Sequence, residues 1–128
     1  MRAVSNFFKT KKTVAKNSGQ KAEQAAEAFL CRQGLTFVER NFYCRTGEID
    51  LIFLDQQTYV FVEVRFRADQ THGTAAESLS SSKLMKVRKS AALWLQKNNK
   101  TDASSRFDAV LFDIKIDHKH LTWLKAVF

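Results

Sequence analysis

The chain has 128 residues, of which 45% are hydrophobic and 27% charged, and it contains 11 Phe, no Pro and two Cys. This length suits one domain around a single core, and the composition argues against a disordered chain. The two cysteines, Cys31 and Cys44, have no recognised metal spacing, so we assign them no chemistry. No apolar run approaches the roughly 18 residues that cross a bilayer, and the N-terminus lacks the apolar centre of a secretory signal, so we expect a cytoplasmic protein without membrane contact.

The formal net charge of +8 favours a polyanionic partner, nucleic acid first, although solvated lysines are the common alternative. Residues 1–18 contain five basic residues and no acidic one. We therefore predict a basic flexible tail over 1–18 and a single domain over 19–128, which keeps only about +3.

Seven elements follow one another in the predicted domain. They are a helix over 19–34, strands over 35–43, 48–54 and 58–66, a helix from the cap candidates at 80–82 to about 97, a strand over 106–116, and a short strand or helix over 121–128. The predicted strands over 48–54 and 58–66 are close enough in the sequence to form a hairpin. The order predicts an α/β fold in which helices cover a sheet whose centre holds the two long strands.

Two acidic residues lie within the predicted hairpin, whose strands are otherwise strongly apolar. Strand residues alternate between faces, so Glu48 shares a face with Asp50, and Glu63 shares a face with Arg65. If the turn is centred on the pair at 56–57, Asp50 is directly opposite Glu63, and Glu48 is opposite Arg65. That register is an assumption, because Gln-Gln is a poor two-residue turn and a shift of half a residue separates the carboxylates onto opposite faces.

Opposed carboxylates in a partly buried setting need compensation, because repulsion and desolvation both disfavour them. A divalent cation such as Mg²⁺ would supply it and would also suit a basic protein that handles nucleic acid. A structural ion network with Arg45, Arg65 or Arg67 would supply it equally well. The hairpin alone leaves both interpretations open.

Three other features carry weaker signals. Lys83, Lys86, Ser90 and Lys97 fall on one face of the second helix, as either a phosphate-facing stripe or a solvated side. The triplet 106–108, Arg-Phe-Asp, opens the fourth strand and is interpreted as an ion pair at the sheet edge. His72 lies in the loop after the hairpin, where a single histidine is more often a bystander than a substrate contact.

Several motifs in this order closely resemble the YraN-like family of small bacterial proteins. They are the G-x-x-x-E of the first helix (Gly19, Glu23), RNFYCRTGEIDLI from Arg40, VFVEVRFR from Val60, the lysine-bearing helix from Lys83 and the RFD triplet. The resemblance covers about residues 19–128. That family in turn resembles the PD-(D/E)xK nucleases close to the archaeal Holliday junction resolvases, whose core is α-β-β-β-α-β, a restriction endonuclease-like mixed sheet flanked by helices.

The resemblance implies a Mg²⁺- or Mn²⁺-dependent endonuclease that hydrolyses phosphodiester bonds in DNA, with branched or recombination intermediates as one substrate class. Asp50 and Glu63 match the metal ligands, Arg65 the lysine position, and Glu23 the acidic residue from the first helix. Candidate nucleic-acid-binding residues are Arg45, Arg67, Lys83 and Lys86. A resolvase would also need two active sites, which implies a homodimer.

Two positions depart from the superfamily pattern. Ile49 replaces its proline, a minor change, but Arg65 replaces its lysine, and an arginine cannot act as a base. Lys83 or Lys86 could supply the missing amine from the second helix. A catalytically impaired nucleic-acid-binding module is therefore the alternative function, and a scaffold protein whose carboxylates only pair with arginines is a third.

Overall fold

The computed structural model describes residues 16–127. Its elements are α1 (Ser18–Arg32), β1 (Thr36–Cys44), β2 (Gly47–Asp55), β3 (Thr58–Arg67), the 3-10 turn η1 (Ala76–Ser78), α2 (Ser81–Lys97), β4 (Ser104–Asp113), the 3-10 turn η2 (His118–His120) and β5 (Leu121–Leu124). The predicted α-β-β-β-α-β order is confirmed, and the closing element is a strand. Most of the predicted tail, residues 1–15, lies outside the described residues.

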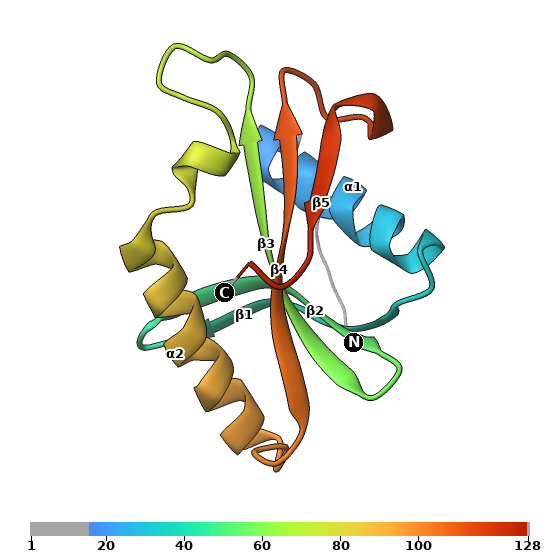
Figure 1. Cartoon of the computed structure of the whole chain (residues 1–128), viewed down its shortest axis with the longest axis vertical. Coiled ribbons are helices and arrows are strands. Elements are labelled where there is room, and N and C mark those ends of the chain that lie inside the picture. The colour runs from blue at the N-terminus through green and yellow to red at the C-terminus, as the bar shows by residue number, and fades with distance from the viewer. Residues whose placement is uncertain (1–15, 128) are drawn as a thin grey trace, which may run out of the picture.

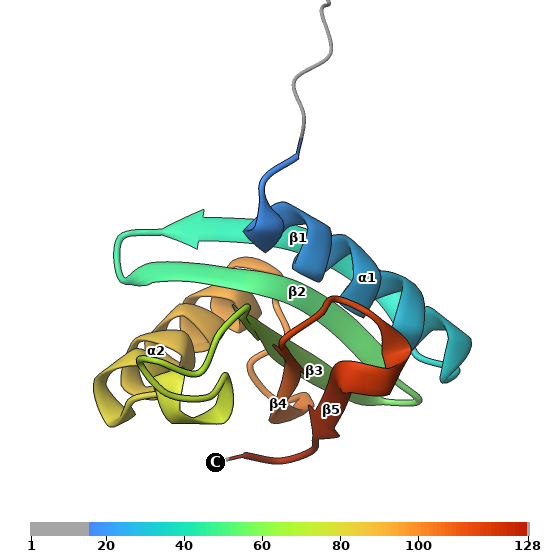
Figure 2. The same ribbon diagram turned by 90° about the horizontal axis from the view of Figure 1, so that it is seen from above.

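The five strands form one mixed sheet in the order β1-β2-β3-β4-β5. Only β3 and β4 run parallel, and the other neighbours are antiparallel. The sheet is strongly twisted, so that β1 and β2 cross the direction of β4 (Figure 1). The view from above places α1 and α2 on opposite sides of the sheet (Figure 2). This arrangement is an α/β fold with a helix on each face, as predicted.

Helix α1 begins with a reciprocal cap that fixes where its first turn lies. Asn17 Oδ1 accepts the backbone N–H of Gln20 at 2.8 Å, and the Gln20 side chain accepts the Asn17 N–H at 3.1 Å. The helix then buries Ala22, Ala26 and Leu30 against one face of the sheet. The same face receives Val60, Val62 and Val64, the even positions of β3, together with Phe53, Val110 and Phe112. The small residues of α1 therefore set the helix close to the central strand.

The hairpin of β2 and β3 has the register that the sequence suggested. Leu51 pairs with Val62 and Asp55 with Thr58, so the turn is centred between Gln56 and Gln57. Gln56 adopts the left-handed backbone conformation that this tight turn requires, with φ of 57°. The turn is formed despite its unfavourable sequence, because the buried strands on either side fix the pairing.

Helix α2 covers the other face of the sheet. Val87, Ala91 and Trp94 pack with Phe42, Ile49, Ile52 and Phe61. Ser90 is completely buried there, and its hydroxyl lies 2.8 Å from that of Thr46. The predicted stripe of Lys83, Lys86, Ser90 and Lys97 is therefore not continuous, because at Ser90 this helix face turns toward the β1–β2 connection.

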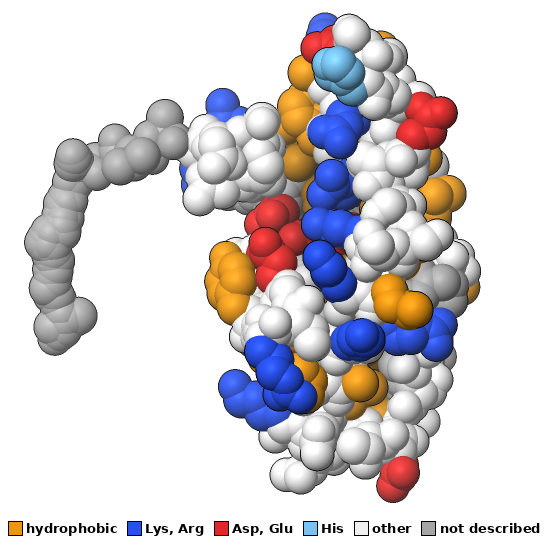
Figure 3. Space-filling model, turned by 90° about the vertical axis from the view of Figure 1, so that its left-hand side faces the viewer, with side chains coloured by type: hydrophobic (Ala, Val, Ile, Leu, Met, Phe, Trp, Pro, Cys, Tyr) orange, Lys and Arg blue, Asp and Glu red, His pale blue; other side chains and the backbone are white. Residues whose placement is uncertain are grey.

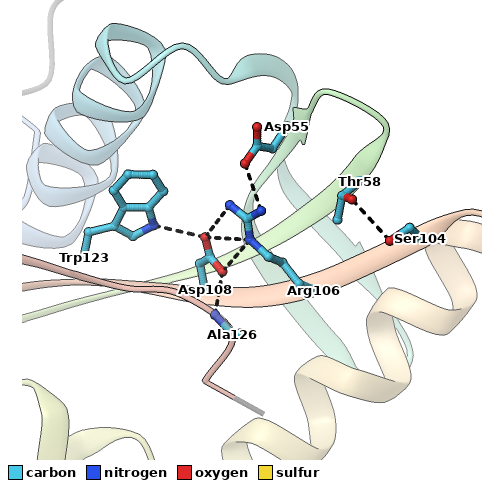
Figure 4. Close-up of polar contacts among 7 residues, drawn as sticks. All are labelled: Asp55, Thr58, Ser104, Arg106, Asp108, Trp123 and Ala126. Carbon is cyan, nitrogen blue, oxygen red and sulfur yellow. Dashed lines mark hydrogen bonds and ion pairs between the residues drawn. The ribbon is translucent and has the colours of Figure 1, made fainter.

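The start of β4 is held by a buried carboxylate that accepts several hydrogen bonds. Asp108 is 1% exposed and accepts from Arg106, from the indole N–H of Trp123 at 3.0 Å and from the backbone N–H of Ala126 at 3.0 Å. Arg106 also reaches Asp55, at the end of β2, at 2.9 Å (Figure 4). The interpretation of the RFD triplet as a structural ion pair thus agrees with the structure, which extends it to β2 and β5.

Candidate functional site: an acidic pocket where β2 and β3 separate

The β2–β3 hairpin opens at Asp50. Regular pairing runs from the turn to Leu51 and Val62 and goes no further. Beyond it, the backbone N–H of Val64 donates to Asp50 Oδ2 at 2.8 Å. Ile49 and Ile52 both lie in the core under α2, although strict alternation would put them on opposite faces. This local irregularity lets the Asp50 side chain enter the gap between the two strands.

A pocket of about 250 Å³ lies at this opening. Its walls come from the first turns of α1, from β2 and β3, and from the start of α2. We call it the acidic pocket, and the charged residues that line it are Glu23, Glu48, Asp50, Glu63, Arg65 and Lys83. The structure thus brings together all four residues that the resemblance marked as catalytic, along with Glu48 and Lys83.

Glu63 is the most buried of these acids, with 3% of its surface exposed. Its Oε2 lies 3.1 Å from the ammonium nitrogen of Lys83 and 3.8 Å from the Arg65 guanidinium. Its Oε1 is buried without a hydrogen-bond partner among residues 16–127. Buried polar atoms are nearly always satisfied, so this oxygen is an acceptor to which the described residues supply no donor.

The pocket shifts the proton affinity of both central carboxyls. Burial, reinforced by the charge of Glu63, raises the pKa of Asp50 to about 8, although the Val64 N–H opposes the shift. Burial also raises the pKa of Glu63, against the opposing effects of Lys83 and Arg65. The charges of Glu23 and Glu48 raise the pKa of Asp50 further. Burial is thus the main reason that both central carboxyls hold their protons more tightly than in water, and the neighbouring acids add to it at Asp50.

The two cations in the pocket are held differently. Arg65 donates from Nε to the hydroxyl of Ser78 at 2.9 Å, and that hydroxyl donates to the carbonyl of Ala75 at 2.6 Å. This anchors the guanidinium to the loop after β3. Lys83 lies in the first turn of α2, where its backbone N–H is capped by Ser80, and its ammonium group makes the shorter contact with Glu63. The expected pairing of Arg65 with Glu48 is not found among the described residues, where Arg65 pairs with Glu63.

The remaining candidate nucleic-acid residues lie outside the lining of the acidic pocket. Arg45 is exposed near the β1–β2 turn, Lys86 is exposed one turn after Lys83, and Arg67 is half-buried at the end of β3. Figure 3 shows acidic side chains beside a column of Lys and Arg side chains along this face of the molecule. Opposite charges are thus adjacent on one surface.

The oxygen donors of the acidic pocket fit a hard divalent cation. Within residues 16–127, no group of three or more His, Cys, Asp or Glu side chains is arranged to hold a metal. Mg²⁺ is commonly held by only one or two carboxylates, with waters and substrate oxygens completing its shell. Asp50 and Glu63, with the unpartnered Oε1, are the residues that would hold it.

Asn41 is a neighbour of the acidic pocket that the sequence pattern alone does not mark as functional. It lies within β1, has a positive φ of 52°, and donates its side-chain amide to Glu23 Oε1 at 3.0 Å. The available signal was its residue type, because asparagine is depleted in strand interiors.

In the part of the chain that the structure covers, no helix is long and apolar enough to span a membrane.

Comparison with known proteins identifies relatives of the whole chain. The model of the Uncharacterised protein family UPF0102 matches residues 22–112. A UPF0102 protein of Marinomonas sp. (strain MWYL1) is 76% identical over 128 residues and covers the full length of both chains. UPF0102 proteins of Colwellia psychrerythraea and Dichelobacter nodosus are 42% and 44% identical, over 96% and 91% of this chain and 97% and 93% of their own. The chain belongs to the UPF0102 family, which confirms the resemblance to YraN-like proteins.

Proposed function

We propose that this protein is a metal-dependent endonuclease that hydrolyses phosphodiester bonds in DNA. The observation that carries the proposal is the buried, unpartnered Oε1 of Glu63, which lies in a pocket shared with Asp50. A free carboxylate oxygen beside a second carboxylate is a donor set for a hard cation, and the adjacent Lys and Arg side chains suit a phosphate backbone (Figure 3).

Five of the six charged residues in the pocket have roles that fit their places there. Asp50 and Glu63 would hold Mg²⁺ or Mn²⁺, and Glu23 would bind a water or help to retain the ion. A bound cation would supply Lewis-acid polarisation of the phosphate and a more acidic water. Lys83 and Arg65 would stabilise negative charge that develops on the phosphate, because both already face the Glu63 carboxylate.

One observation favours a second candidate function, nucleic-acid binding without turnover. Lys83 and Arg65 both approach Glu63 Oε2, so this carboxylate has cationic partners even without a metal. In addition, Arg65 is anchored to Ser78 and is always protonated, so it cannot serve as a base. A binding module would use the same face and the same cations.

Calorimetry with Mn²⁺ and cleavage assays on duplex, flap and four-way-junction DNA separate the two functions. We expect the wild-type chain to bind Mn²⁺ and to cut at least one of these substrates. Asp50→Asn and Glu63→Gln should abolish both properties and leave DNA binding intact. Asp102→Asn removes an exposed carboxylate in the turn after α2 and should change neither. Salt-sensitive DNA binding with no cutting of any substrate would establish the binding module instead.

A further inference from the structure

We propose that Asn41 is a positioning residue that holds Glu23 at the acidic pocket, so that a carboxylate from α1 acts on the cation bound by Asp50 and Glu63. The inference rests on the proposed function. It assigns a role to a residue whose side-chain amide donates to Glu23 and not to either of the two central carboxylates.

Asn41 occupies an irregular position in β1, at the level of Asp50. Arg40 pairs with Leu51 and Phe42 with Ile49, so Asn41 is the β1 residue across from Asp50. Its φ of 52° is left-handed, which is uncommon within a strand and strained for most residues. Asparagine is one of the few residues besides glycine that adopt this conformation routinely. The register of β1 with β2 is the same on both sides of Asn41, so the irregularity of β1 at this level is the backbone conformation of Asn41 itself.

The side chain of Asn41 uses this conformation to reach the first helix. Its amide nitrogen Nδ2 donates to Glu23 Oε1 at 3.0 Å. Glu23 lines the acidic pocket and also the neighbouring cavity that contains Asn41. The hydrogen bond therefore joins β1 to α1 at the edge of the pocket and fixes one of the two oxygens of Glu23.

The donor that binds Glu23 is the side-chain amide of Asn41, which carries no charge and so leaves the charge of Glu23 in place. The nearby cations have other partners: Arg40 binds Glu27 through two hydrogen bonds of 3.0 and 2.8 Å, and Lys16 binds Gln24 at 2.6 Å. Among the described residues Glu23 forms no ion pair, so its negative charge is oriented without being neutralised. An arginine or lysine in place of Asn41 would cancel the charge that a cation site requires.

Mn²⁺ calorimetry on a double-mutant cycle tests this role. Asn41→Gly tolerates the left-handed backbone and removes only the amide. We expect it to weaken Mn²⁺ binding roughly tenfold, the low end for the loss of a group that orients a metal ligand. Glu23→Gln should weaken binding similarly, and the double variant should bind no more weakly than Glu23→Gln alone, because Asn41 acts through Glu23.

Asn99→Gly is the matched control. Asn99 also has a left-handed φ of 57° but lies in the turn after α2, away from the pocket, so its replacement should leave Mn²⁺ affinity unchanged. A second measurement uses the unmodified chain: on addition of Mg²⁺, the side-chain amide resonance of Asn41 should shift while that of Asn99 does not. This measurement decides the matter if Asn41→Gly does not fold.

The outcomes distinguish this inference from the proposed function. If wild type binds Mn²⁺ and Asp50→Asn does not, but Asn41→Gly binds like wild type, only the role of Asn41 is overturned. A double variant whose loss of Mn²⁺ affinity equals the sum of the two single losses also overturns it. So does an Asn41 side-chain resonance that does not shift when Mg²⁺ is added. A wild-type chain that binds no Mn²⁺ overturns the cation site together with this inference.

Discussion

The backbone N–H of Val64 donates a 2.8 Å hydrogen bond to the carboxylate of Asp50 at the level where β2 and β3 stop pairing. A side chain thereby satisfies a buried strand donor, which would otherwise cost about 1–3 kcal/mol. The same bond keeps Asp50 within the acidic pocket, where only 7% of its surface is exposed. One interaction thus stabilises the opened strand and positions a charged group in it.

Replacing Asp50 with Asn should stabilise the metal-free protein at pH 8. The pKa of Asp50 is raised to about 8 in the folded state, so that state binds more protons than the unfolded chain between about pH 4 and pH 8, and stability falls as pH rises through this range. Asn mimics the protonated carboxyl and can still accept the Val64 N–H. We expect a gain on the order of 2 kcal/mol at pH 8 that disappears near pH 4, measured by urea unfolding in chelator. A difference that does not depend on pH would contradict it.

Mn²⁺ affinity should rise with pH between pH 6 and pH 8. Because burial and the charge of Glu63 raise the pKa of Asp50 to about 8, a cation must displace a proton from this carboxyl in that range. Displacement of one proton gives an affinity that increases about tenfold per pH unit and levels off above pH 8. Calorimetry in two buffers of different ionisation enthalpy would count the released protons. An affinity that is constant from pH 6 to pH 8 would exclude Asp50 as a ligand.

Lys83→Met should reduce DNA cleavage by about 100-fold, because the Lys83 ammonium nitrogen lies 3.1 Å from Glu63 Oε2, closer than the guanidinium of Arg65. Lys100→Met is the control, since Lys100 is exposed after the end of α2 and does not line the pocket. Single-turnover rates on a substrate that wild type cuts would measure both variants. Equal rates for Lys83→Met and wild type would leave Arg65 as the only cation of the pocket to act on the phosphate.

Asp108→Asn should destabilise the fold by about 3 kcal/mol without changing Mn²⁺ or DNA binding. Asp108 is fully buried, and its loss of charge leaves the half-buried Arg106 with Asp55 as its one anionic partner among residues 16–127 (Figure 4). Chemical denaturation gives the stability, and binding is measured well below the unfolding midpoint. A loss of Mn²⁺ affinity in the folded variant would show that this network is coupled to the acidic pocket.

Deletion of residues 1–15 should weaken DNA binding in a salt-dependent way. The deletion removes four cations, Arg2, Lys9, Lys11 and Lys12, and no acidic residue. For each phosphate that no longer has a basic partner, the slope of log affinity against log salt should become shallower by about 0.9. Fluorescence anisotropy at several salt concentrations gives the slopes for the full chain and the shortened one. Identical slopes would mean that these cations do not bind the nucleic acid.

The order of elements and the pairing of the hairpin could be predicted from the sequence, because both depend on local patterns. Alternation along β3 separates Val62 from Glu63, and only one turn centre places Asp50 opposite Glu63. The clustering of Asp50 with Glu63 followed from that register. Glu23 could be added only through the family resemblance, since nothing in the spacing of α1 indicates which strand it meets.

The parts that the sequence could not predict are interactions between elements far apart along the chain. Ser90 was assigned to a lysine stripe by helical periodicity, yet it is buried because the β1–β2 connection presents Thr46 to it. The preference of Lys83 over Lys86 depends on where Ser80 caps α2. The partners of Asp108 come from β5, whose place beside β4 no local pattern specifies.

The position of Lys83 has a consequence for the order of folding events. The hairpin is a local structure and can form early, but it brings Asp50 and Glu63 together before α2 delivers the ammonium group that faces Glu63. Repulsion between the two carboxylates therefore opposes early hairpin formation at neutral pH, and protonation of either carboxylate relieves that repulsion. Refolding of the metal-free chain should accordingly speed up as the solution is made mildly acidic. The repulsion within the acidic pocket would then raise the barrier to folding only until α2 docks and Lys83 faces Glu63.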